Sequence, residues 1–213
     1  MQAYPNHAKQ RLEQGKISTG LGLRQARTAD IAAIGKTAGF DWLFIDMEHS
    51  SLDLDTAAQI CAAALPTGIT PIVRVPGKEH HHASRMLDNG AQGVVVPHVN
   101  SAEEAARAVS YCKYPPIGHR SVGGWGPHYQ LGKLSTGDAV NALNAANLTV
   151  VMLETPTAIA NAAEIAAVPP RVVARASGPR SGGNTRQVSR LRIPGAAPAN
   201  RVRPAGCNPR NWI

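Results

Sequence analysis

The feature that most constrains the fold is the regular alternation of short apolar runs with amphipathic segments, which continues to about residue 168. Segments with apolar residues at helical spacing separate these runs, among them residues 28–38, 54–65 and 100–112. Successive apolar strands joined by helices predict an α/β fold, with a parallel sheet covered by helices. The five runs with the length of strands are residues 17–23, 41–46, 70–75, 92–99 and 148–154.

The length of 213 residues is sufficient for one sizeable domain with its own core. No apolar stretch approaches the roughly 18 residues of a membrane span, and the first residues lack the apolar part of a secretory signal. We therefore expect a cytoplasmic protein without a membrane partner. Cys61, Cys112 and Cys207 are far apart and form no C-x-x-C pair, which predicts neither a disulfide framework nor a zinc site.

The formal net charge of +8 comes from the C-terminal part of the chain. Residues 169–213 contain nine Arg and neither Lys nor an acidic residue, whereas the charges of residues 1–168 nearly balance. We expect residues 1–168 to form a partial barrel domain and residues 169–213 to form an irregular tail rich in Arg, Pro and Gly. Such a composition is typical of an out-of-frame translation of a GC-rich gene, a hypothesis that resequencing across this boundary would test.

Ionisable side chains gather where the predicted strands end. Asp46, Glu48 and His49 follow the second apolar run, Arg74 lies in the third, and Glu154 ends the fifth. Each has a structural interpretation when taken singly, since Asp46 could cap a helix and a lone His is more often packed than catalytic. The carboxyl ends of parallel strands meet at one edge of a sheet, where α/β proteins bind ligands. Together these residues predict a functional site at that edge.

Five motifs follow one another along the chain: DWLFIDMEH at 41–49, RVP at 74–76, LDNGAQGVVVPH at 87–98, YPPIGHRSVGG at 114–124 and LET at 153–155. They resemble successive motifs of the HpcH/HpaI aldolase family. The resemblance extends over roughly residues 17–168 and implies a (β/α)8 TIM barrel, of which this chain has about six βα units. It also implies a metal-dependent aldolase that cleaves a 2-keto-3-deoxy or 4-hydroxy-2-keto acid to pyruvate and an aldehyde; macrophomate synthase is a relative of that family.

The resemblance implies a role for several residues. Glu154 matches a carboxylate that binds a divalent metal, for which Mg²⁺ or Mn²⁺ is expected and Co²⁺ is a further candidate. Arg74 matches the arginine that faces the developing enolate oxygen. His49 matches a base that acts through water, and Asp88 matches the carboxylate that orients its imidazole.

Three further positions follow less directly from the same resemblance. Asp46 is expected to support the His49 network and to lie in the substrate site. Arg120 belongs to a segment that closes over the substrate in the family, so we expect it to contact the substrate. Glu48 is the residue of the second strand end whose role the resemblance leaves open.

The chain departs from the family pattern after residue 168. A second metal carboxylate is expected about one βα unit beyond Glu154, but the region reads RASGPRSGG, with Arg180 and Ser181 at the expected place, and no acid follows Glu164. One carboxylate binds a divalent ion weakly, which predicts impaired chemistry. The family's trimers and hexamers use C-terminal helices that have no recognisable counterpart here, so the predicted assembly stays open.

Other functions remain as alternatives. The chain could be an acyl-CoA lyase similar to the citrate lyase β chain, although its motifs match the aldolase branch better. A Schiff-base aldolase needs a desolvated lysine, and Lys78, near a strand end, lies in a polar context. A non-catalytic fragment whose basic tail binds nucleic acid is the alternative from another class; Trp212 is the only aromatic residue of that tail, which disfavours it. The run at 80–82 of three His is interpreted as the solvated start of a helix.

Overall fold

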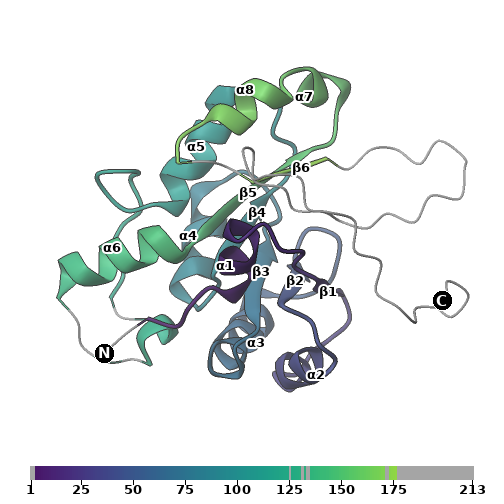
Figure 1. Cartoon of the computed structure of the whole chain (residues 1–213), viewed down its shortest axis with the longest axis vertical. Helices are drawn as coiled ribbons and strands as arrows, with labels where there is room; N and C mark the ends of the chain where they lie inside the picture. Colours follow the sequence, from purple (N-terminus) through teal and green to yellow (C-terminus); the bar gives the residue numbers. More distant parts are fainter. Residues whose placement is uncertain (1–2, 125, 131, 133–134, 171–172, 177–213) are drawn as a thin grey trace, which may run out of the picture.

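A parallel sheet of six strands forms the centre of the molecule. The computed structural model describes residues 3–124, 126–130, 132, 135–170 and 173–176. Each strand pairs in parallel with the next along the chain, which confirms the predicted α/β class. The strands are β1 (Gly20–Leu23), β2 (Trp42–Asp46), β3 (Thr70–Arg74), β4 (Gly93–Val96), β5 (Leu148–Leu153) and β6 (Val173–Ala176) (Figure 1).

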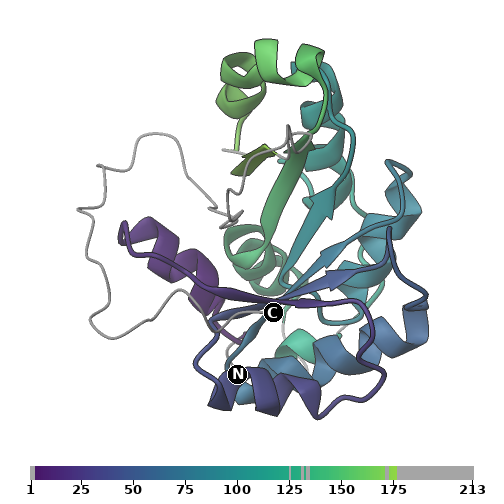
Figure 2. The same cartoon turned by 90° about the vertical axis from the view of Figure 1, so that its right-hand side faces the viewer.

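Helices connect the strands and cover one face of the sheet. Figure 2 shows the curved sheet with α1 on one side and α3, α4 and α5 on the other. In the described part of the chain, no helix is long and apolar enough to cross a membrane. The helices are α1 (His7–Glu13), α2 (Ile31–Thr37), α3 (Leu54–Thr67), α4 (His80–Asp88), α5 (Ala102–Cys112), α6 (Thr136–Ala146), α7 (Pro156–Ala160) and α8 (Ala162–Ala167), with a 3-10 turn, η1 (Pro127–Tyr129).

The helix termini agree with local capping signals. Ser101 accepts a hydrogen bond from the backbone N–H of Glu104, and the side chain of Glu104 accepts one from the backbone N–H of Asn100, so two backbone donors at the start of α5 are satisfied. Helix α3 ends at Gly68, whose φ of +71° suits a residue without a Cβ. Helix α4 begins at His80, which confirms that the three His start a helix.

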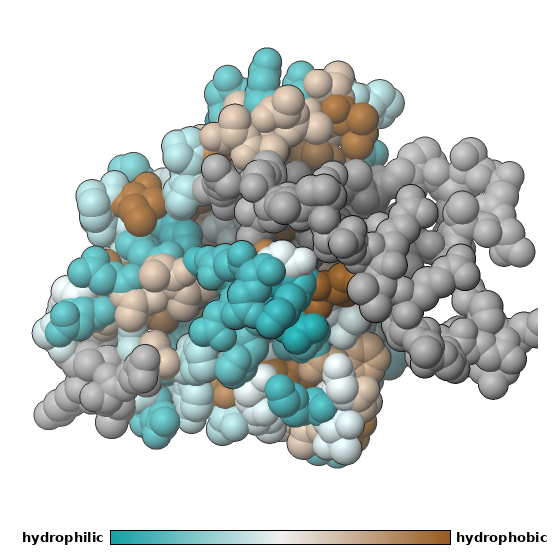
Figure 3. Space-filling view, viewed as in Figure 1, coloured by the Kyte–Doolittle hydropathy of each residue, from teal (hydrophilic) through white to brown (hydrophobic). Residues whose placement is uncertain are grey.

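Alternation along the strands divides the core between the two faces of the sheet. In β2, Leu43 and Ile45 pack under the helices, whereas Trp42 and Phe44 belong to a second cluster on the opposite, inner face. Ala8 of α1 joins that second cluster, so α1 packs against the inner face. The surface around α1 is mainly hydrophilic in the view of Figure 3.

The same alternation decides where the charged residues at the strand ends point. Asp46 continues the inner series after Trp42 and Phe44 in β2, and Arg74 follows Ile72 in β3. Glu154 lies two residues after Met152, which also faces inward from β5. Three of the predicted site residues therefore share the inner face at the carboxyl edge of the sheet.

The sheet continues beyond the predicted end of the domain. Strand β6 pairs with residues 150–153 of β5, although residues from 169 onward were expected to form an irregular tail. Four residues of the Arg-rich segment therefore have backbone hydrogen-bond partners at the edge of β5. Residues 177–213 lie outside the described part of the chain.

Candidate active site

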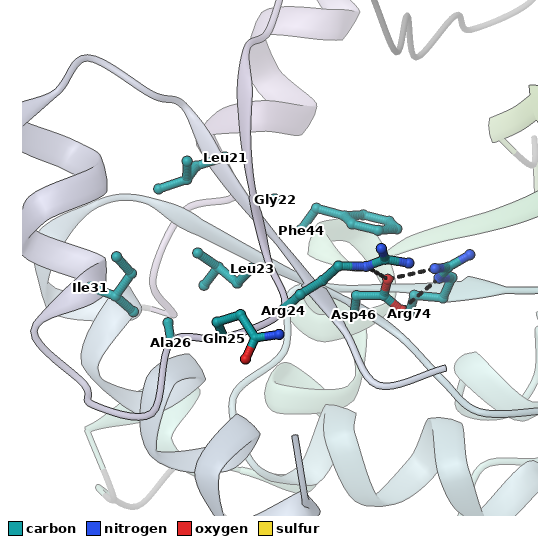
Figure 4. A pocket seen from close by; sticks show the side chains of 10 residues that line it. All are labelled: Leu21, Gly22, Leu23, Arg24, Gln25, Ala26, Ile31, Phe44, Asp46 and Arg74. Atoms are coloured by element: carbon teal, nitrogen blue, oxygen red, sulfur yellow. Dashed lines mark hydrogen bonds and ion pairs between the residues drawn. The ribbon is translucent and has the colours of Figure 1, made fainter. Parts of the chain in front are cut away.

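Asp46 accepts five hydrogen bonds at the carboxyl edge of the sheet. Its side chain is 2% exposed and accepts hydrogen bonds from Nε and Nη2 of Arg74, at 2.9 and 2.6 Å, and from Nε of Arg24 at 2.9 Å (Figure 4). The backbone N–H groups of Glu48 and His49 also donate to it. Burial alone would raise the pKa of Asp46, but the bonds from Arg74, His49 and Arg24 outweigh burial and hold its pKa well below the usual range. Asp46 is therefore a fixed anion that orients Arg74.

Arg74 lies between two carboxylates. Besides the bidentate pair with Asp46, its Nη1 is 2.9 Å from Oε2 of Glu48, in an ion pair without hydrogen-bond geometry. The guanidinium lies 5.5 Å from the centre of the Phe44 ring, and Nη1 is 3.8 Å from the sulfur of Met152. With a side chain that is 7% exposed, Arg74 is held at one place on the inner face.

Glu48, His98 and Glu154 form a second group at the same edge. Oε1 of Glu48 is 2.8 Å from Nε2 of His98, and Nδ1 of His98 is 3.1 Å from Oε2 of Glu154. The backbone N–H of His98 donates to the same oxygen of Glu154 at 3.1 Å. His98 follows β4 in the left-handed region, with φ at +56°, and this conformation turns its backbone and ring toward Glu154. Loops after β2, β4 and β5 thus converge.

His49 lies at this edge, as predicted. Its side chain is 56% exposed, and Nε2 is 3.8 Å from Oε2 of Glu48. Solvent therefore reaches the imidazole, while its backbone N–H is anchored to Asp46. The geometry places His49 beside the Arg74 ion pairs with one nitrogen turned toward a carboxylate.

Asp88 and Arg120 do not join this group within one chain. Asp88 ends α4, which runs back from the carboxyl edge, and its Oδ1 accepts a hydrogen bond from Nη2 of Arg120 at 2.6 Å. Arg120 stacks 4.5 Å from the ring centre of Tyr114 and bonds through its backbone to Lys113, whose Nζ reaches the residue before β5. Both residues lie near the amino ends of the strands. The described residues show no contact of Asp88 with His49, which the resemblance implies.

Two lysines bear on the Schiff-base alternative. Lys78 is exposed, and its Nζ donates to Glu104 at 2.8 Å, so it lacks the desolvated setting that this chemistry requires. Lys113 is buried, and burial lowers its pKa to about 8. Its Nζ, however, is bound to the carbonyls of Asn144 and Asn147 at 2.6 and 2.7 Å, at the opposite edge from Arg74. Neither lysine contacts Arg74 or the carboxylates beside it.

The carboxylate oxygens at the carboxyl edge are of the type that binds a hard divalent cation. Oε2 of Glu48 is buried and lacks a hydrogen-bond partner, and the side chain of Glu154 is 19% exposed. Both are carboxylate oxygens, the ligand type that Mg²⁺ and Mn²⁺ prefer. The described residues contain no group of three or more His, Cys, Asp or Glu arranged as a ligand set. Arg180 and Ser181, at the expected place of the second carboxylate, lie outside the described residues.

A pocket of about 570 Å³ opens beside Asp46 and Arg74. Leu21 and Leu23 line it on one side of β1, and Phe44, Arg24 and the Asp46–Arg74 pair line it on the other (Figure 4). The lining residues come from β1, β2 and β3, from the loop after β1 and from the start of α2. The charged edge therefore adjoins a space large enough for a small organic acid.

Comparison with known proteins decides the family. The sequence model of the HpcH/HpaI aldolase/citrate lyase family matches residues 24–180. The chain belongs to this family. The resemblance inferred from the motifs is thereby confirmed.

Among the relatives, the chain is 38% identical over 165 residues to the 4-hydroxy-4-methyl-2-oxoglutarate aldolase cghB of Chaetomium globosum, covering 76% of this chain and 61% of the relative. It is 38% identical over 176 residues to a 4-hydroxy-2-oxovalerate aldolase of Novosphingobium aromaticivorans, covering 79% and 63%. The chain thus spans about three fifths of the length of these relatives.

The solved structures agree. The HpcH/HpaI aldolase of Desulfitobacterium hafniense DCB-2 superposes with a TM-score of 0.75 at 29% identity, over 79% of this chain and 65% of that one. The fold is of the TIM-barrel type, as predicted, and the described residues supply six of its strands.

His98 was not among the site residues predicted from the sequence, and the resemblance assigned no role to Glu48. Both lie next to buried strands, Glu48 after β2 and His98 after β4. Applying the strand-end rule to the fourth strand, as to the second, would have found His98. No sequence signal indicates that His98 adopts a left-handed backbone, which is what brings it to Glu154.

Proposed function

We propose that this chain is a metal-dependent aldolase that cleaves a 4-hydroxy-2-oxo acid to pyruvate and a carbonyl compound. The observation that carries the proposal is the guanidinium of Arg74, fixed by Asp46 and Glu48 beside the Glu48–His98–Glu154 group. The names of the curated relatives support it, since those proteins are aldolases for 2-oxo acids.

Arg74 would stabilise the charge that develops during cleavage. As the C3–C4 bond breaks, its electron pair moves to C3 and gives the enolate of pyruvate, whose oxygen becomes negative. Asp46 takes two of the five N–H groups of the guanidinium, which fixes the plane of the group and leaves other donors for the enolate oxygen. A donor fixed before the reaction stabilises such an oxygen without reorganising.

His49 would move the proton. The C4 hydroxyl must lose its proton when C4 becomes a carbonyl carbon, and C3 of the enolate must gain one to give pyruvate. The imidazole of His49 is solvent-accessible and lies near Glu48, so it can accept the first proton directly or through water. The protonated imidazole can then return a proton to C3, which balances the reaction.

Glu154 and Glu48 are the residues that would hold a divalent cation, with Mg²⁺, Mn²⁺ and Co²⁺ as the candidates. When bound, such an ion supplies positive charge that polarises the 2-oxo group. Oε2 of Glu48 supports this assignment, because it is buried and makes an ion pair with Arg74 but no hydrogen bond within the described part of the chain.

The test is release of pyruvate from a 4-hydroxy-2-oxo acid, measured with and without each metal. We expect activity that depends on the metal and falls by about 100-fold or more in Glu154→Gln, since removal of a ligand or of its support weakens metal binding. Glu164→Gln is the matched control, because Glu164 is exposed on α8. Absence of pyruvate with every metal, or full activity of Glu154→Gln, would contradict the proposal.

Nucleic-acid binding and the oligomeric assembly remain predictions. The basic residues from 177 onward lie outside the described part of the chain, so the geometry bears on neither. For the domain organisation, we propose one domain that reaches at least to Ala176, since β6 is a member of the sheet.

A further inference from the structure

Arg24 stands out because it is a cation of the pocket with unused hydrogen-bond donors. It follows β1, and its Nε donates to Oδ2 of Asp46 at 2.9 Å. Its terminal nitrogens make no hydrogen bond within the described residues, and the side chain is 55% exposed. The two guanidinium groups of Arg24 and Arg74 meet at the same oxygen of Asp46, so they lie side by side at one end of the pocket (Figure 4).

Asp46 is shared between two guanidinium groups at this end of the pocket. Asp46 already accepts hydrogen bonds from Arg74, Arg24 and two backbone N–H groups, so its oxygens have little capacity for a further donor. Glu48 approaches Arg74, and no carboxylate apart from Asp46 approaches Arg24 in the part of the chain that the structure describes. The pocket therefore presents the guanidinium of Arg24 with its terminal nitrogens unpaired within the described residues.

The pocket also has apolar lining. The Phe44 ring lies beside the two guanidinium groups, and Leu21, Leu23 and Ile31 line the pocket on the other side of β1 (Figure 4). A ligand that fills this space would combine a short hydrocarbon segment with an anionic group at its end. A carboxylate suits the free edge of a guanidinium best, because two parallel N–H groups can bind its two oxygens.

We propose that Arg24 binds a second carboxylate at the far end of the substrate, so that the chain prefers 4-hydroxy-2-oxo dicarboxylic acids to their monocarboxylic counterparts. The inference rests on the proposed aldolase function. A substrate whose 2-oxo group faces Arg74 has its C4 and C5 atoms a few bonds away, and Arg24 is the neighbouring cation. The Phe44 ring then contacts the carbon atoms between the two acidic groups.

A purely structural role for Arg24 makes a different prediction. If Arg24 only helps to hold Asp46, its loss would weaken Arg74 and slow every substrate by the same factor. If it also binds the second carboxylate, its loss slows the dicarboxylic substrate by a larger factor than the monocarboxylic one. The ratio between two substrates of equal length therefore separates the roles.

The first experiment compares 4-hydroxy-2-oxoglutarate with 4-hydroxy-2-oxovalerate, which differ by a carboxylate in place of a methyl group. We expect kcat/KM of the wild type to favour the dicarboxylic acid by about 100-fold, and Arg24→Gln to lose that preference chiefly through KM. Arg24→Lys should restore part of it. Arg27→Gln is the control, because Arg27 is exposed and bonds to Ser51. Equal kcat/KM for both substrates, or an equal loss for both in Arg24→Gln, would overturn the inference.

A binding experiment separates this inference from the proposed reaction. 2-Oxoglutarate and 2-oxovalerate lack the C4 hydroxyl and cannot undergo the cleavage. Calorimetry with the Mg²⁺-loaded protein should show tighter binding of 2-oxoglutarate by the wild type and equal affinities for Arg24→Gln. If that preference appears while neither hydroxy acid is cleaved, the aldolase proposal fails and the role of Arg24 stands. Equal affinities in the wild type, or no binding of either acid, overturn the role of Arg24.

Discussion

The interaction of Arg74 with Asp46 shows how one buried pair can organise a site. Removing two charges from water is costly, and a buried ion pair is maintained only when its hydrogen bonds are well satisfied. Here Asp46 accepts bonds from two arginines and two backbone N–H groups, and Arg74 is further flanked by Glu48. The arrangement fixes a cation at the one edge where the loops after β2, β4 and β5 meet.

His128, away from this site, gives a prediction about pH. It is 4% exposed and hydrogen-bonded to the carbonyl of Leu87 at 2.8 Å, and burial lowers its pKa from 6.5 to about 4. Between these values the unfolded chain binds a proton that the folded chain does not. The free energy of unfolding should therefore fall by about 3 kcal/mol as the pH drops from 6.5 to 4, and this contribution is constant above pH 6.5.

The measurement is urea unfolding across that pH range for the wild type and for His128→Gln, which keeps a donor for the Leu87 carbonyl. The variant should lose less stability on acidification than the wild type, because its side chain does not titrate. Identical pH dependence of the two proteins would show that His128 is not held neutral by the fold.

Residue by residue, the sequence predicts positions better than contacts. Asp46, Arg74 and Glu154 were placed correctly at one edge, because strand alternation and the direction of parallel strands determine this. The importance of His98 depends on a positive φ that no pattern indicates. The expected contact of Asp88 with His49 depends on which ends of α4 and β2 are adjacent, and within one chain Asp88 binds Arg120 instead.

At the scale of elements, β1 offers a matched pair of glycines. Gly20 is opposite Trp42 in the parallel register, and a Cβ at Gly20 would overlap the buried indole ring. A Cβ at Gly22 would meet nothing within 4 Å. Gly20→Ala should therefore lower the free energy of unfolding by about 1–3 kcal/mol.

Gly22→Ala should leave stability unchanged or raise it by up to about 1 kcal/mol, because alanine reduces the freedom of the unfolded chain. Thermal unfolding of the two variants against the wild type tests the pair. Equal melting temperatures for Gly20→Ala and the wild type would contradict the close packing of Gly20 against Trp42.

The five strands predicted from apolar runs are all present, with ends that differ by a few residues. Strand β6 was not predicted, because its sequence VARA lies among Arg, Pro and Gly and has no apolar period. Its place is set by pairing with β5, which is a property of the neighbouring strand and not of its own sequence. Long-range pairing of this kind is what single-sequence patterns lack.

At the scale of the whole molecule, family membership and the geometry of one edge support the same chemistry. The family match extends from residue 24 to residue 180, past the expected end of the domain and in agreement with the presence of β6. The inner face of the sheet, with α1 against it, brings Arg74 and Glu154 to the edge where TIM barrels carry their active sites.

The central claim is that Arg74 stabilises the enolate of pyruvate, and exchange of the methyl protons of pyruvate with solvent tests it without a carbonyl partner. Proton NMR in deuterium oxide should show Mg²⁺-dependent loss of the methyl signal with the wild type. Arg74→Lys should slow the exchange by about 100-fold, because lysine cannot reproduce the fixed fork, whereas Arg85→Lys should not change it. Exchange at the uncatalysed rate with every divalent metal, or exchange that Arg74→Lys leaves intact, would contradict the account.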